Sequence, residues 1–198
     1  MLRRAMIAAL LLCAAGMLPG CGSGKLKWST QDISGVMPDL KFRLTDEHGQ
    51  PVQADAYAGK YTLLFFGYTH CPDICPATLS VLEAALHKIG ASADRIEVLF
   101  VSVDPKRDTP KALSRYTSSF GPGITGLTGT PAELDALTKR YRVTYRYGKP
   151  DKDGNYLVYH SAAIFAFDPK GHVRLLMKYT DGVPAIAHDL EQLVQPES

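Results

Sequence analysis

The sequence predicts one α/β domain with a mixed β-sheet flanked by helices, and three observations carry this prediction. Residues 61–67 and 96–103 are apolar runs of strand length, and residues 76–89 between them show an amphipathic helical pattern. A succession of strand, helix and strand forms a parallel strand pair with a right-handed crossover. Two later apolar runs flank the turn sequence of residues 168–171 (DPKG), which predicts a hairpin of antiparallel strands.

The composition is that of a single folded domain with a short appendage. The chain has 198 residues, of which 45% are hydrophobic and 21% are charged, so the length is too small for two large domains. The net charge is +2, and removal of Arg3 and Arg4 would leave a neutral chain. A neutral chain without a basic stripe is a poor candidate for nucleic-acid binding.

Residues 1–20 are expected to be a lipoprotein signal peptide. Arg3 and Arg4 precede an apolar run over 5–18, which is too short for a membrane span but suits a signal-peptide core. The run ends in LPGC, which resembles a bacterial lipobox, although Pro19 stands where a small residue is usual. We therefore expect lipidation of Cys21 and attachment to a bilayer in the bacterial cell envelope, facing the periplasm. An ordinary secretory signal that contains a cysteine is the alternative.

Residues 21–35 are rich in Gly, Ser, Lys and Thr and are expected to be a lipidated tether, with the domain over residues 36–198. Alternation over 41–44, followed by turn residues at 46–49, predicts an N-terminal hairpin. The remaining elements follow from apolar periodicity, proline and glycine positions. They are helices over 110–120, 131–141 and 184–194 and strands over 156–167 and 172–179.

The four cysteines do not form two structural disulfides in this interpretation. Cys13 leaves with the signal peptide and Cys21 takes the lipid, so Cys71 and Cys75 remain. A disulfide between them would close a loop too short to restrain the unfolded chain. The pair follows a strand and precedes a helix, where Cys75 is expected at the N-cap position, which favours a thiolate. Two such sulfurs can form a redox-active disulfide or bind one soft metal ion.

His160 and Asp104 are the residues expected near this pair. If residues 161–167 run antiparallel to the first two strands, His160, which directly precedes them, lies at the edge where those strands end. Asp104 ends the second strand at the same edge, as a turn residue or as a support to the ligands.

Three segments of the chain resemble the Sco/SenC family of copper-binding proteins. Residues 67–76 (GYTHCPDICP), residues 102–110 (SVDPKRDTP) and His160-Ser161 match the family's motifs in order, and the resemblance extends from about Met37 to the C-terminal helix. Tyr159 stands where many relatives carry Asp. The resemblance implies a thioredoxin-like fold that binds copper through Cys71, Cys75 and His160.

The resemblance also implies a role in building the binuclear copper centre of cytochrome c oxidase. The expected partner is the copper-bearing subunit of that oxidase or another periplasmic copper protein. Two thiolates suit Cu(I) and an added imidazole suits Cu(II), while Zn(II) accepts the same ligands. The chain is thus expected to be a metallochaperone and not an enzyme, with accessory thiol–disulfide reductase activity left open. A periplasmic thiol–disulfide oxidoreductase is the alternative function, although such reductases normally carry two residues between the cysteines and this chain carries three.

Overall fold

The structure is a computed structural model, and it describes residues 27–195. The expected signal peptide and Cys21 lie outside the described residues. Within those residues, no helix combines the length and the apolar character that a bilayer crossing requires.

A mixed eight-stranded sheet forms the centre of the domain, in the order β1-β10-β9-β4-β5-β6-β2-β3. Its middle strands, β4 (Tyr61–Gly67) and β5 (Ile96–Ser102), are buried along their whole length and pair in parallel. Helix α1 (Ile74–Ile89) connects them, and β6 (Ile124–Thr128) adds a third parallel strand beside β5. The expected strand–helix–strand unit is therefore confirmed.

Antiparallel strands extend the sheet on both sides of this unit. On one side, β9 (Ile164–Phe167) pairs with β4, and β10 (Val173–Met177) pairs with β9. On the other side lies the expected N-terminal hairpin, in which β2 (Arg43–Asp46) pairs with β3 (Pro51–Gln53) and with β6. The antiparallel direction of β9 against β4 places the start of β9 beside the carboxyl end of β4.

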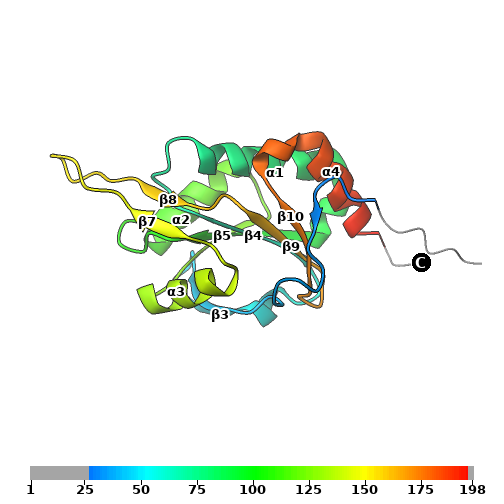
Figure 1. Ribbon diagram of the computed structural model, residues 1–198, viewed down its shortest axis with the longest axis horizontal. Coiled ribbons are helices and arrows are strands. Elements are labelled where there is room, and N and C mark those ends of the chain that lie inside the picture. The colour runs from blue at the N-terminus through cyan, green and yellow to red at the C-terminus, as the bar shows by residue number, and fades with distance from the viewer. Residues whose placement is uncertain (1–26, 196–198) are drawn as a thin grey trace, which may run out of the picture.

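Helices cover both faces of the sheet (Figure 1). Helices α1 and α4 (Gly182–Leu193) lie together on one face, and α3 (Pro131–Arg140) lies on the other. Helix α2 (Pro110–Thr117) packs against β6. Thr109 and Thr130 cap α2 and α3, each followed by proline in the first turn. Short 3-10 segments complete the chain at Ala54–Tyr57, Gly90–Arg95, Ser118–Phe120 and Tyr179–Asp181.

The strand expected over residues 156–167 is interrupted. Its first part, β8 (Val158–His160), leaves the main sheet and pairs with β7 (Tyr145–Tyr147), and residues 161–163 separate it from β9. The β7–β8 hairpin projects beyond the sheet, at the far side from the chain's described N-terminal segment (Figure 1). This hairpin carries His160.

Residues before 36 also pack onto the domain. Strand β1 (Gln31–Asp32) pairs with β10, and Ile33 is buried. The buried carboxylate of Asp189 on α4 accepts hydrogen bonds from the backbone N–H groups of Ser29 (2.8 Å) and Thr30 (2.7 Å). The last part of the segment expected as a tether is therefore fixed to the domain.

Candidate metal centre

The two cysteines lie at the carboxyl end of β4, where the chain turns into α1. Helix α1 begins at Ile74 with Asp73 as its N-cap, so Cys75 is the second residue of the helix and the expectation of Cys75 at the N-cap was wrong. The reason is that the helical hydrogen bonding starts earlier, with the N–H of Ala77 donating to the carbonyl oxygen of Asp73 (3.1 Å). The earlier start turns the Cys75 side chain inward, and this cysteine is fully buried.

Gly67, the last residue of β4, makes room for the sulfur of Cys75. A Cβ atom at this position would lie 2.5 Å from Cε2 of Phe100 and 2.9 Å from Sγ of Cys75. Neither approach is compatible with a side chain in an unshifted structure. The first motif therefore requires glycine at residue 67 for a steric reason.

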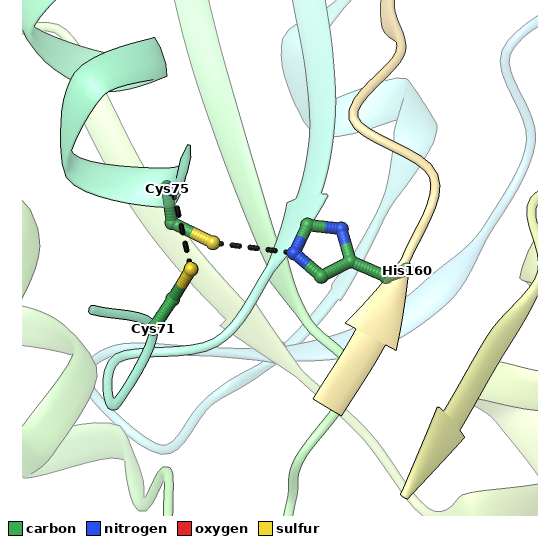
Figure 2. Close-up of side chains that lie close together, drawn as sticks. All are labelled: Cys71, Cys75 and His160. Carbon is green, nitrogen blue, oxygen red and sulfur yellow. Dashed lines mark hydrogen bonds between the residues drawn. The ribbon is translucent and has the colours of Figure 1, made fainter. Parts of the chain in front are cut away.

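His160, the last residue of β8, completes the group. Its Nε2 atom lies 3.3 Å from Sγ of Cys75 (Figure 2). Its Nδ1 atom lies 3.1 Å from the carbonyl oxygen of Ser161. Because a carbonyl oxygen only accepts hydrogen bonds, Nδ1 carries the proton and the lone pair of Nε2 faces the sulfur atoms. The rings of Phe65 and Tyr68 pack against the imidazole in edge-to-face arrangements, with centroids at 6.2 and 6.0 Å, and hold its orientation.

The three ligand atoms, two sulfurs and one nitrogen, all lie within 4.8 Å of one another. No other group of three or more His, Cys, Asp or Glu side chains with this geometry occurs in residues 27–195. The strand directions in the sequence analysis predicted that His160 would face the cysteine loop, and the structure places it there. A soft ion that binds thiolate and imidazole fits this set of donors.

The electrostatics assign different protonation to the two sulfurs. The pKa of Cys71 is lowered chiefly by a hydrogen bond from the Cys75 thiol, and also by the backbone N–H of Cys75, 3.3 Å from Sγ of Cys71. The pKa of Cys75 is raised, first by the same contact with Cys71 and then by burial. The stabilised thiolate is thus Cys71, whereas the sequence analysis assigned it to Cys75. One thiolate and one thiol share a proton that a metal ion displaces.

Asp108 fixes the loop that carries the cysteines. Its carboxylate is fully buried and accepts hydrogen bonds from the Thr69 N–H (2.8 Å), the Thr69 hydroxyl (2.6 Å) and the Ser102 hydroxyl (2.6 Å). Residue 102 ends β5, so this carboxylate ties the cysteine loop to the neighbouring strand. Asp108 lies within the second motif, but no role for it was predicted, because its burial and its partners are not visible in the sequence.

Asp104 supports the hairpin that carries His160, and its hydrogen-bond partners do not include the three ligands. Its buried carboxylate contacts the guanidinium Nε of Arg107 (2.5 Å) and accepts from the hydroxyl of Tyr156 (2.9 Å). The guanidinium of Arg107 also stacks over the Tyr156 ring, 3.7 Å from its centroid. The hydroxyl of Tyr147 donates to the carbonyl oxygen of Val103 (2.7 Å), which is a second tie between hairpin and sheet.

The other histidines of the described chain do not join the centre. His70 precedes the ligand Cys71 in the sequence, but its exposed imidazole contacts the Thr69 hydroxyl (3.0 Å) and is not one of the three ligands. The remaining four are exposed and do not belong to the group of three ligands: His48, His87, His172 and His188.

Comparison with known proteins places these features in a family. A family model described as SCO1/SenC matches residues 35–195. The mitochondrial SCO2 homolog of Mus musculus is 40% identical over 132 residues, which cover 66% of this chain and 52% of that protein. The chain spans about half the length of the curated relatives it matches.

Two solved structures show the same fold. The structure of ScoI from Bradyrhizobium japonicum with copper bound shares 40% identity at a TM-score of 0.71, over 78% of this chain and 98% of that one. The solution structure of apo Sco1 from Thermus thermophilus shares 33% identity at a TM-score of 0.74, over 86% and 99% of the two chains. These likenesses confirm the thioredoxin-like fold. Since the family model covers nearly the whole described domain, the chain belongs to the SCO1/SenC family.

Proposed function

We propose that this protein is a copper chaperone that binds copper through Cys71, Cys75 and His160. The observation that carries the proposal is the convergence of two sulfurs and one imidazole nitrogen within 4.8 Å at the edge of a rigid sheet. Family membership supports copper as the ion, because a relative of 40% identity has been solved with copper bound. The cargo would be delivered to the binuclear copper centre of cytochrome c oxidase, and the protein would act as a chaperone and not as an enzyme.

The donor set suits an ion that is taken up and released. Thiolates select Cu(I), and the imidazole adds a ligand that Cu(II) accepts, so the three residues can bind copper in either state. Nδ1 of His160 is held by the Ser161 carbonyl, which orients the ring and raises the basicity of Nε2. Cys71 is only half-buried, so an incoming ligand can reach the site from its side.

The proposed location is the periplasmic side of a bacterial membrane, with attachment through lipid on Cys21. The apolar run over 5–18 followed by LPGC supports this part of the proposal. Several acyl chains on one cysteine give stable attachment, which a single chain does not. Mass spectrometry of the protein from membranes would detect the lipid on Cys21, and replacement by Ser should release the protein.

Metal quantification on the reduced full-length protein tests the copper assignment. We expect about one Cu per chain and reduced binding for Cys71→Ser, Cys75→Ser and His160→Ala. The exposed His87 on α1 provides a matched control, because His87→Ala removes an imidazole distant from the ligands. Delivery is then measured as copper transfer to the soluble copper-bearing domain of the oxidase subunit. Stoichiometric zinc with no copper would contradict the assignment.

A thiol–disulfide oxidoreductase is the second candidate function. Its support is the unequal protonation of the cysteines, because a half-exposed Cys71 thiolate beside a buried Cys75 thiol is an arrangement suited to thiol–disulfide exchange. Rapid turnover of a disulfide-bonded partner by metal-free protein would favour this function. His160→Ala separates the two candidates, since it removes a copper ligand and leaves both sulfurs in place.

A further inference from the structure

Large hydrophobic side chains are exposed at one end of the described domain. Ile74, Leu157 and Tyr159 are 41%, 46% and 53% exposed, and Tyr147 on the same hairpin is 46% exposed. Within residues 27–195, the only other exposed large hydrophobic residue is Val36, at 64%. Exposed hydrophobic residues that gather in one place mark interaction sites, whereas single ones do not.

Three of these residues line a hollow beside the metal centre. Ile74, Leu157 and Tyr159, here called the apolar rim, line a hollow of about 200 Å³ that also contains Cys71 and His160. Leu157 directly precedes β8, and Tyr159 lies within it, two residues further along the chain. The guanidinium of Arg146 lies 4.9 Å from the centroid of the Tyr159 ring and supports that side chain.

The burial of the three ligands determines the side from which an incoming ligand can reach the metal. Cys75 is fully buried, with its sulfur beside Gly67, whereas Cys71 and His160 are half-buried. Cys71 is the partly exposed sulfur, and it opens into the hollow. An exchanging ligand therefore approaches copper across the apolar rim.

We propose that the apolar rim is the docking surface for the copper-exchanging protein, and this inference rests on the proposed function. The partner presents a sulfur ligand among apolar side chains, because Cu(I) passes most readily between thiolates or thioethers. A bond from copper to the partner's sulfur forms as the bond to Cys71 breaks. Copper stays Cu(I). Each partner thiol that binds loses a proton, and the Cys71–Cys75 pair regains the single proton that it shares in the metal-free state.

The test compares a protein acceptor with a small one. Full-length protein loaded with Cu(I) is mixed with the reduced apo copper-bearing domain of the oxidase subunit or with bathocuproine disulfonate. For Leu157→Ser and Tyr159→Ser we expect roughly tenfold slower transfer to the protein domain. Transfer to the chelator, and copper affinity, should stay at wild-type values. Val36→Ser is the matched control, because it removes an exposed hydrophobic side chain outside the rim.

The outcomes separate the two proposals. Transfer to the domain by both rim variants at the rate of Val36→Ser would overturn the docking surface while leaving copper delivery intact. Slower transfer to the chelator as well would also overturn it, because the rim would then act on the centre itself. A wild-type protein that binds no copper, or delivers none to the domain, would refute the proposed function and the docking surface with it.

Discussion

The Nε2 atom of His160 lies 3.3 Å from Sγ of Cys75, although 85 residues separate the two along the chain. The contact joins two separate parts of the fold. Cys75 belongs to the helix after a parallel strand, and His160 ends a hairpin that projects from the sheet. The hydroxyls of Tyr147 and Tyr156 tie that hairpin to the end of β5.

Replacement of His160 by Ala should weaken copper binding without unfolding the protein. Loss of a residue that only orients a metal ligand typically lowers affinity about 10- to 100-fold, so loss of the ligand itself should lower it at least tenfold. Competition with a Cu(I) chelator of known affinity measures the change, and circular dichroism checks the fold. An unchanged affinity would remove His160 from the set of copper ligands.

Gly67→Ala should disturb the metal centre and the core together. The new methyl group would meet Cε2 of Phe100 at 2.5 Å and Sγ of Cys75 at 2.9 Å. Overpacking of this kind destabilises a protein by about 1–3 kcal/mol, and here it also displaces a ligand sulfur. Urea unfolding and chelator competition measure the two effects.

Gly126→Ala is the matched control for that variant. Gly126 lies on β6, and its methyl group would meet Cβ of Leu113 on α2 at 2.8 Å, while none of the three atoms nearest to it belongs to a ligand residue. We expect a similar loss of stability with copper affinity unchanged. Equal losses of affinity in both variants would show that general destabilisation, and not the contact with Cys75, weakens binding.

The strand–helix–strand unit and the meeting of His160 with the cysteines could be predicted from the sequence. Buried parallel strands read as continuous apolar runs, and strand direction then places residues at a common edge. Strand β6 was missed because Gly126 and two threonines interrupt its apolar pattern. The exposed β7 was missed because its polar and aromatic residues do not form an apolar run.

The supporting residues of the centre could not be predicted, because their roles depend on contacts between distant parts of the chain. The need for glycine at residue 67 follows from its short distances to Cys75 and Phe100, which no local sequence pattern encodes. Asp108 resembles any loop aspartate until its burial and its bonds to Thr69 and Ser102 are known. The motif resemblance singled out residues 102–110, and the structure shows that Asp108 is the side chain in this segment that holds the cysteine loop.

Asp108→Asn should loosen the cysteine loop. The buried carboxylate accepts three hydrogen bonds, and an amide has only one oxygen to accept them. Hydrogen bonds to a charged group contribute about 1.5–3 kcal/mol each, so we expect a clear loss of stability and weaker copper binding. Thermal unfolding and chelator competition give the two values. Asp135→Asn, on the exposed face of α3, is the control and should change neither.

The pKa shift of Cys71 predicts an unusual pH dependence of its reactivity in the reduced, metal-free protein. The Cys75 thiol and nearby backbone N–H groups stabilise the Cys71 thiolate, so its pKa lies well below the ordinary value of about 8.5. A lowered pKa keeps the thiolate present as pH falls, and the anion is lost only near the lowered pKa. Between about pH 8 and pH 6, alkylation of Cys71 by iodoacetamide should therefore change little.

The same reaction in denaturant supplies the reference, because an ordinary cysteine loses about tenfold in rate for each pH unit below its pKa. Cys75→Ala removes the largest stabilising hydrogen bond and should restore part of that slope. Rates at Cys71 are measured by mass spectrometry of the modified peptide. If folded and denatured protein show the same tenfold decline per pH unit, Cys71 is an ordinary thiol, and copper uptake would then have to remove a proton from each cysteine.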